Sequence, residues 1–268
     1  LVENSKNDQR FASTLAHGMA LLRCFTPFAP SLTNGELARR SGLSKATVCR
    51  LSYTLELIGL LRFDQEARRY RLGAASLSMA YPLLAHLPVR QVARPLMQRL
   101  ADRTGGTVSL GMRHRASVIY IETTREHDVG DFRPEIGAAL PLLRTAAGRA
   151  WLAACEVAER EDAYAWLQRS TGKSLAALGA AEVVDTAVRD LRERGFCISQ
   201  GDFLHDVNGL ALPLRERVRG ELVMLNCGML QGRMGSAQLE RDVGPLLKDT
   251  AAQIDQLLQE NQKQVAQP

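Results

Sequence analysis

Between residues 44 and 58 the chain has its clearest repeat of apolar and polar positions. Apolar side chains recur there every three or four residues, which places four of them on one side of a helix, namely Val48, Leu51, Leu55 and Ile58. Ser44 precedes them as a favourable N-cap. The pattern predicts an amphipathic helix with an inward apolar stripe and an outward polar side.

A shorter helix is predicted just before it, over residues 36–41. Thr33 and Glu36 have the spacing of a capping box, in which a hydroxyl and a carboxylate satisfy free amides at the start of a helix. Gly42 can end the helix by adopting a positive φ. Two helices joined by a tight turn that contains glycine are typical of a helix-turn-helix, whose second helix fits the major groove of DNA.

The elements around this pair complete a small domain. Residues 11–25 predict a covering helix, whose apolar positions are Phe11, Leu15, Met19, Leu22 and Phe25. Residues 60–63 and 69–72 predict two strands around a polar turn, with arginines in and beside the second strand. A helix-turn-helix followed by a basic hairpin is typical of a winged helix-turn-helix.

The positive charge of the chain is concentrated on the same segment. Residues 1–80 contain 11 lysines and arginines against 6 aspartates and glutamates, a net charge of +5 that equals the net charge of all 268 residues. Residues 81–268 contain 23 residues of each sign. A DNA-binding domain needs this distribution, because much of its affinity comes from phosphate contacts. No run of basic residues lies beside an apolar face, as a membrane surface site would require.

We therefore predict that the outward side of the second helix and the hairpin bind double-stranded operator DNA. On the helical wheel the side opposite the apolar stripe carries Ala46, Cys49, Arg50 and Tyr53. Of these we expect Ala46, Cys49 and Tyr53 to face base edges. We expect phosphate contacts from Lys45, Thr47, Arg50, Arg68 and Arg69. The alternative is an ordinary pair of surface helices, since many amphipathic pairs share this spacing.

The rest of the chain alternates between helical and extended patterns. Residues 74–87 predict a helix bent at Pro82, with leucines and a tyrosine on one side that could pack within the molecule or form a dimer seam. Further helices are predicted at 92–104, 183–194 and 239–257, and strands at 107–112, 117–122, 209–214 and 221–227. Strands interleaved with helices favour an α+β domain around an antiparallel sheet.

Motifs of catalysis are missing from the sequence. It has no GxSxG elbow, no GxxxxGK[ST] loop, no GxGxxG and no HExxH. Asp202 and His205 could contribute to a metal site, but no cluster of cysteine or histidine accompanies them, so a solvated loop pair is the better interpretation. We expect no enzyme activity, no cofactor and no metal. Scattered cysteines without a CxxC pair, and the lack of a long apolar run or leader, lead us to expect a cytoplasmic protein.

The segment Thr145-Ala-Ala-Gly148 is more informative. A capped helix that begins with small residues presents free amides to an anion. The alternative is a capped helix whose small residues allow tight packing, and the sequence favours neither interpretation.

Several motifs, in their order along the chain, are similar to those of the IclR family of bacterial transcriptional regulators. They are Thr33-Asn-Gly-Glu-Leu-Ala, Ser41-Gly-Leu-Ser-Lys-Ala-Thr-Val-Cys-Arg-Leu, Tyr70-Arg-Leu-Gly73, Thr104-Gly-Gly-Thr-Val, Leu140-Pro-Leu-Leu-Arg-Thr-Ala-Ala-Gly-Arg-Ala and Val207-Asn-Gly-Leu-Ala-Leu-Pro213. The resemblance covers about residues 11–258. It implies a winged helix-turn-helix, a linker helix that dimerises, and a GAF-like domain that binds a small effector, with dimers commonly pairing into tetramers on operator DNA.

The charge asymmetry, the residue patterns and the resemblance together predict a division of the chain. We expect a disordered tail (1–10), a winged helix-turn-helix DNA-binding domain (11–73), a linker helix (74–87), an α+β effector-binding domain (88–260) and a second tail (261–268).

The sensing domain departs from the family pattern. Gly106 stands where an acidic residue is usual, Arg149 where lysine is usual, and Asp206 in a usual glycine position. Members that sense very small oxo-acids have Asp, Cys, Ser and Ser at four contact positions, which here are Ser199, Gly209, Asn226 and Gly228. Because two glycines remove side-chain volume, we expect an organic acid longer than two carbons, aromatic or long-chain.

We expect the carboxylate of that acid at the backbone amides of Ala146 and Ala147, behind the cap Thr145. The remaining pocket positions are expected on strands, namely Ser109, Ser199, Gly209, Asn226 and Gly228. The alternative is a packed core without a ligand.

Two hypotheses for the function follow. The first is a DNA-binding regulator of a catabolic operon that responds to a small organic acid and assembles with itself as a dimer or tetramer, away from membranes. The second is a metabolite-binding protein or enzyme with a non-regulatory N-terminal domain. The basic segment 1–80 and the missing catalytic motifs favour the first.

Overall fold

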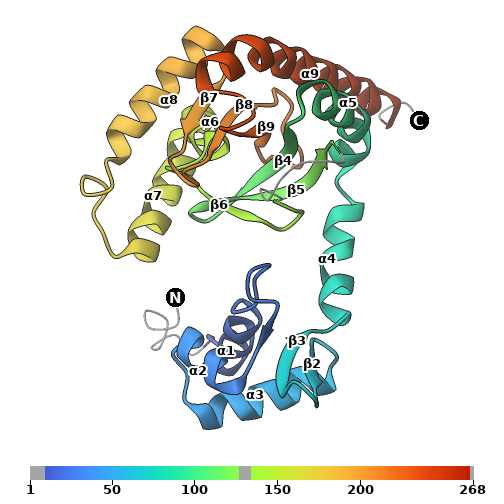
Figure 1. Cartoon of the computed structure of the whole chain (residues 1–268), viewed down its shortest axis with the longest axis vertical. Coiled ribbons are helices and arrows are strands. Elements are labelled where there is room, and N and C mark those ends of the chain that lie inside the picture. Colours follow the sequence, from blue (N-terminus) through green and yellow to red (C-terminus); the bar gives the residue numbers. More distant parts are fainter. Residues whose placement is uncertain (1–9, 127–133, 266–268) are drawn as a thin grey trace. The chain divides into compact units, whose positions relative to one another are not determined.

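The computed structural model describes residues 10–126 and 134–265 (Figure 1). The chain divides into two compact units, Leu1–His86 and Leu87–Pro268. Apart from Arg10, the tail expected at residues 1–10 lies outside the described residues.

The first unit contains the winged helix-turn-helix that the sequence predicted. Its helices are α1 (Ser13–Leu22), α2 (Asn34–Ser41) and α3 (Lys45–Leu57), and its strands are β1 (Ser31–Leu32), β2 (Leu61–Asp64) and β3 (Arg69–Leu72). The strands form an antiparallel sheet in the order β1-β3-β2, and the β2–β3 hairpin is the wing.

The predicted caps explain where the two central helices begin and end. The Glu36 amide donates to Thr33 Oγ1 over 3.2 Å, and the Thr33 amide donates to Glu36 Oε2 over 2.8 Å, which completes the capping box of α2. Gly42 ends α2 with φ of 71°. Ser44 caps α3 by accepting from the Thr47 amide. These local signals set the tight turn between α2 and α3.

The predicted apolar stripes are correct only in part. Leu15 and Met19 of α1 are 67% and 43% exposed, and the buried side chains around that helix are those of Leu21, Cys24 and Phe25. The helix ends at Leu22, three residues before its predicted end at Phe25. On α3 the stripe ends early, because Ile58 is the C-cap and is 57% exposed.

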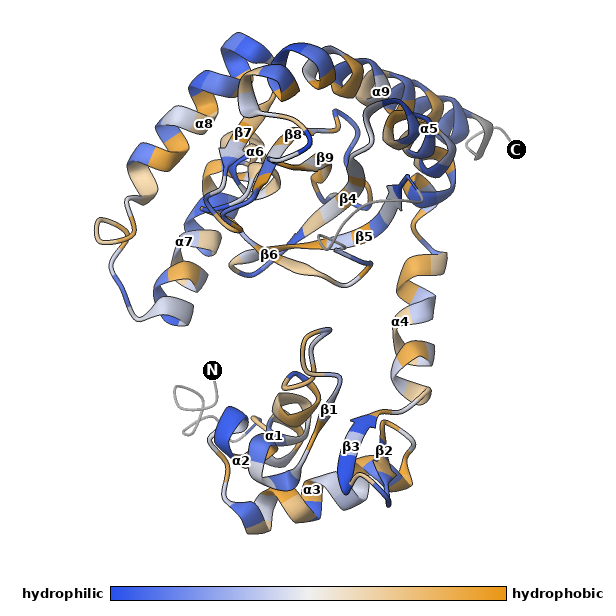
Figure 2. Cartoon of the chain, viewed as in Figure 1, coloured by the Kyte–Doolittle hydropathy of each residue, from blue (hydrophilic) through white to orange (hydrophobic). Residues whose placement is uncertain are grey.

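Helix α4 (Ala75–Ala85) ends the first unit. It contains Pro82, and none of its side chains is buried. Apolar residues nevertheless dominate it, as the orange bands of Figure 2 show. Leu87, the last residue of the helix predicted here, is 2% exposed and belongs to the second unit.

The second unit is an α+β domain around one antiparallel sheet in the order β6-β5-β4-β9-β8-β7. The strands are β4 (Thr107–His114), β5 (Ser117–Arg125), β6 (Ala139–Pro141), β7 (Cys197–Gln200), β8 (Val207–Pro213) and β9 (Val223–Leu230). The predicted pairing of the strands at 107–112 and 117–122 is confirmed. A bulge interrupts it, because Leu110 pairs with Glu122 whereas Gly111 pairs with Tyr120.

Helices cover both faces of this sheet (Figure 1). Helices α5 (Pro88–Thr104) and α9 (Ser236–Val265) pack together on one face, which we call the α5 face. Helix α6 (Ala146–Ala154) packs on the other, which we call the α6 face, with α7 (Val157–Thr171) and α8 (Ala180–Arg194) beyond it. Because α9 extends to Val265, residues 261–265 of the expected second tail are helical.

Candidate DNA-binding and effector-binding sites

Helix α3 presents its predicted contact residues on its exposed side. Five of them are exposed, namely Lys45, Ala46, Cys49, Arg50 and Tyr53, while Thr47 is half-buried. The opposite side packs into the core of the unit through Val48 and Leu55. The exposed side therefore has the geometry and charge that a major-groove contact needs.

Sequence reasoning missed a polar contact that fixes the direction of this side. Ser52 of α3 is fully buried, and its hydroxyl donates to Asn34 Oδ1 over 3.4 Å. The Asn34 amide also donates to Cys49 Sγ over 3.4 Å. These contacts tie the start of α2 to the middle of α3, and thereby set how α3 is rotated about its axis.

The two predicted arginines of the wing have different surroundings. Arg68 is exposed at the hairpin turn with φ of 49°, a left-handed conformation that is common in tight turns. Arg69 instead forms an ion pair of 2.8 Å with Glu36 and donates to Ser31 Oγ. Hydrogen bonds from Thr33, followed by the Arg69 contact, lower the pKa of Glu36 to about 2. Arg69 therefore fastens the wing to α2.

The predicted effector residues of the sheet meet on the α6 face. Ser199, Gly209, Gly228 and Thr107 are directly opposite one another across β7, β8, β9 and β4. Side chains at opposite positions of antiparallel strands share a face. A Cβ placed on Gly209 would lie 3.1 Å from Ser199 Oγ, 3.6 Å from Ala146 Cβ and 3.7 Å from Asn226 Oδ1. The structure thus brings residues from β7, β8, β9 and α6 together around one glycine.

A buried polar group that the sequence did not indicate adjoins them. Asn226 Nδ2 donates to the Tyr120 hydroxyl over 2.9 Å, and both residues are buried. Burial raises the pKa of Tyr120 far above its usual range, so the hydroxyl stays neutral. Ser109, a predicted pocket residue, shares a hydrogen bond of 3.1 Å with Thr123 on β5. The bulge in β5 turns Tyr120 onto the α6 face, and simple strand alternation could not reveal this.

The start of α6 has the cap and the tight packing of one interpretation of its sequence, and anion binding stays a prediction. Thr145 Oγ1 accepts from the Gly148 amide and donates to the Pro141 carbonyl, so this hydroxyl serves as a cap. A Cβ on Gly148 would lie 2.2 Å from the Leu142 carbonyl oxygen, which shows the tight packing. The amides of Ala146 and Ala147 belong to the first turn, where helix geometry supplies no partner within the helix.

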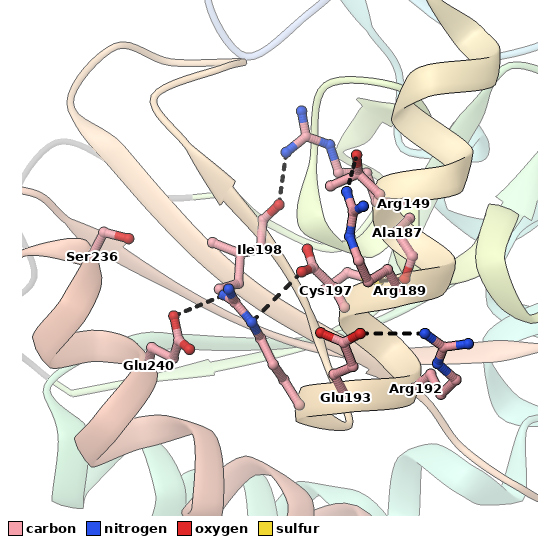
Figure 3. Close-up of polar contacts among 12 residues, drawn as sticks. Arg149, Ala187, Arg189, Arg192, Glu193, Cys197, Ile198, Ser236 and Glu240 are labelled. Carbon is pink, nitrogen blue, oxygen red and sulfur yellow. Dashed lines mark hydrogen bonds and ion pairs between the residues drawn. The ribbon is translucent and has the colours of Figure 1, made fainter.

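Arg149 and the loop after β7 enclose this region. Arg149 donates to the Ile198 carbonyl of β7 over 2.7 Å (Figure 3) and forms an ion pair of 3.0 Å with Asp202. Asp202 is thus held by an arginine, and His205 beside it is exposed. Within residues 10–126 and 134–265 no three acidic, histidine or cysteine side chains are grouped so that they could hold a metal ion.

Comparison with known proteins assigns both units. Residues 14–65 match the family description "IclR helix-turn-helix domain", and residues 82–256 match "Bacterial transcriptional regulator IclR C-terminal". The chain belongs to the IclR family. It is a transcriptional regulator of the IclR type, with a DNA-binding helix-turn-helix and an effector-binding domain.

Two curated regulators and one solved structure illustrate the similarity. The HTH-type transcriptional regulator TsaQ1/TsaQ2 of Comamonas testosteroni is 30% identical over 90% of this chain and 86% of its own length. The p-hydroxybenzoate hydroxylase transcriptional activator of Acinetobacter baylyi is 25% identical over 92% of each chain. The crystal structure of an IclR family regulator from Brucella abortus is 34% identical, with a TM-score of 0.76, over 94% of this chain and 95% of that one.

A second solved structure shares the IclR fold at lower identity. It is an IclR homologue from Microbacterium hydrocarbonoxydans in complex with 4-hydroxybenzoate, 20% identical, with a TM-score of 0.72 over 92% of this chain and 99% of that one. The described part of the present chain includes no helix with the length and apolar character that a membrane crossing requires.

Proposed function

We propose that this IclR-type regulator controls a catabolic operon in response to an organic acid longer than two carbons. The observation that supports the proposal is the convergence of Ser199, Ala146 and Asn226 around Gly209. Ser199 and Asn226 supply hydrogen-bonding groups, Gly209 places no side chain between them, and the first turn of α6 supplies amides. An acid whose carboxylate binds the amides of Ala146 and Ala147 places its remaining atoms over the glycine.

Relatives support an aromatic acid as the first class to test. One curated relative is the activator of p-hydroxybenzoate hydroxylase, and another, from Pseudomonas putida, is the Pca regulon regulatory protein. In the proposed pocket Asn226 Oδ1 lies over Gly209, where it can accept a hydrogen bond from a ligand hydroxyl. Gly228, opposite Gly209, and Ser109 complete the strand side of the pocket.

The test is a thermal-shift screen with benzoate, 4-hydroxybenzoate, terephthalate, hexanoate and adipate. A ligand that binds only the folded chain raises its melting temperature, because it stabilises the fold by RT ln(1 + [L]/Kd). The acid with the largest shift should lose its effect in Gly228→Leu, whose side chain would fill the pocket. An equal shift in that variant would place the binding site elsewhere.

On the DNA side, α3 enters the major groove of the operator. Ala46, Cys49 and Tyr53 face base edges, while Lys45, Thr47 and Arg50 contact phosphates. Arg68 at the tip of the wing adds a phosphate contact. Arg69 lies beside it and acts mainly through its ion pair with Glu36. The regulator works in the cytoplasm, where its operator is found, and needs neither a cofactor nor a catalytic step.

Helix α4 joins two copies of the chain. Four of its apolar side chains are more than half exposed, namely Leu77, Met79, Tyr81 and Leu83. Exposed apolar side chains in such number on one short helix are typical of an interaction surface. A dimer places two winged domains on the DNA at once, and a specific operator requires this because one domain alone buries little surface. Dimers can pair further into tetramers.

A further inference from the structure

Arg125 lies in the same row of the sheet as the proposed effector pocket. Arg125 on β5 is directly opposite Thr107 on β4. The row continues from Thr107 to Gly228 on β9 and then to Gly209 on β8. Opposite positions share a face, so the Arg125 side chain leaves β5 on the α6 face. From Gly209 to Arg125 the row crosses three strand spacings, roughly 14 Å at about 4.8 Å each. The two glycines leave the middle of this row without side chains.

Two polar atoms at the Arg125 end of the row make no hydrogen bond to any residue that the structure describes. Thr107 is 1% exposed, and its Oγ1 makes no hydrogen bond within the described part of the chain. Nη1 of Arg125 is buried and likewise has no partner there. Buried polar groups in folded proteins are normally satisfied, so two unsatisfied groups on residues that are opposite each other in paired strands favour a place where a ligand supplies the missing atoms.

The chemistry of these two groups selects an anion. Arg125 carries a fixed positive charge, and a guanidinium binds a carboxylate well because its donors form a planar fork. Nη2 of Arg125 is already ion-paired with Glu135, whose side chain is 62% exposed. Glu135 therefore leaves Nη1 free for a second acidic partner, and its own charge opposes the approach of that partner.

We propose that the effector is a diacid, with one carboxylate at the first turn of α6 and a second acidic group at Arg125 and Thr107. The proposal rests on the proposed effector pocket and deepens it. The span between the two ends excludes short diacids and fits a benzene ring or a chain of similar length between the two acidic groups. Arg125 and Thr107 then determine specificity, because they distinguish a diacid from the monoacid of the same skeleton.

Calorimetry of matched acids tests the proposal. Terephthalate is compared with benzoate, and adipate with hexanoate, on wild type, Arg125→Gln, Glu135→Gln and Arg241→Gln. Arg241 is an exposed residue of α9 that serves as a matched control. For at least one pair, wild type should bind the diacid about tenfold more tightly than the monoacid. Arg125→Gln should remove that preference. Its affinity for the monoacid should stay within about twofold of the wild-type affinity.

Glu135→Gln separates binding from a merely structural role of the ion pair. If Glu135 competes with the diacid for Arg125, removing its carboxylate should strengthen diacid binding. If the ion pair is only structural, its loss should affect the diacid and the monoacid alike: both bind more weakly, or neither changes. It also retains Arg125, so the test holds even if Arg125→Gln fails to fold. Arg241→Gln should behave as wild type.

Two outcomes would overturn the assignment of Arg125. One is a wild type without preference for either diacid, and the other is a preference that persists in Arg125→Gln. If the acids still bind in these cases and Gly228→Leu abolishes binding, the pocket stands and only the second acidic end is wrong. If no acid binds, or Gly228→Leu leaves binding unchanged, the proposed pocket fails together with the diacid.

Discussion

Gly209→Ala offers a sharp test of the pocket, because the structure predicts a clear loss of ligand affinity with little change in the stability of the fold. The backbone of Gly209 does not have a positive φ, so alanine causes no backbone strain there. Its Cβ would meet Ser199 Oγ at 3.1 Å, and that hydroxyl can move by rotation. The loss of chain entropy in the unfolded state favours alanine by about 0.4–1 kcal/mol, which offsets the tight contact. Stability should change by less than about 1 kcal/mol.

The same methyl group occupies the space that the proposed effector needs. Ligand atoms that bond both Ser199 and Asn226 must pass over Gly209, since both side chains lie within 4 Å of the new Cβ. Displacing them removes up to two hydrogen bonds, each worth about 0.5–1.5 kcal/mol net. Affinity should therefore fall by about 1–3 kcal/mol, which is roughly 5- to 150-fold.

The assay pairs calorimetric affinity for the strongest acid of the screen with urea unfolding. Gly148→Ala is the contrasting variant, because its Cβ would lie 2.2 Å from the backbone oxygen of Leu142 and cannot be accommodated by rotation of a side chain. We expect that variant to lose about 1–3 kcal/mol of stability or more. A Gly209→Ala protein that binds the acid as tightly as wild type would refute the pocket.

Three further predictions concern assembly, pH and the buried amide. Leu77→Asp should reduce the mass seen in sedimentation to that of a monomer, whereas Ser78→Asp on the same helix should not; equal masses for wild type and Leu77→Asp would place the seam elsewhere. Hydrogen bonds from Thr33 lower the pKa of Glu36 from 4.5 to about 2, and a hydrogen bond from Arg217 does the same for Glu159. The two carboxylates therefore stabilise the fold fully above pH 4.5, and this stabilisation is lost as the pH falls through 2. The Glu36→Gln/Glu159→Gln variant should be less stable than wild type at pH 7, and the difference should disappear towards pH 2; a constant difference would contradict these pKa values. Asn226→Ala should cost about 1–3 kcal/mol in unfolding experiments, because it leaves the buried Tyr120 hydroxyl without its donor, and an unchanged midpoint would argue against that contact.

Much of the first unit could be predicted because its signals are local. A capping box, an N-cap serine and a glycine at the helix end each act within about one turn, so Thr33, Ser44 and Gly42 marked the helices directly. Which apolar side becomes buried depends on the neighbouring elements. Leu15 and Met19 kept the helical spacing of a core stripe and are nevertheless exposed.

For the proposed effector pocket, the sequence could predict single strands and single helices but not how they come together. Ser199, Gly209 and Asn226 were expected from the family resemblance, but their convergence depends on strand register across β7, β8 and β9. Tyr120 joins them through a bulge, and Arg125 through its pairing with Thr107. Neither residue carries a sequence signal of its own, since both positions follow from long-range pairing.

The central claim is that an organic acid bound in the second unit changes the affinity of the first for operator DNA. The most direct measurement is fluorescence anisotropy of labelled DNA from upstream of the chain's own gene, titrated at several salt concentrations with and without saturating acid. The affinity for DNA should fall as the salt concentration rises. Arg50→Ala should reduce the steepness of log K against log salt concentration by about 1. The acid should change DNA affinity by about 5- to 150-fold, the range of ordinary coupling energies. A DNA affinity that stays the same at saturating acid, although the acid binds, would contradict the claim.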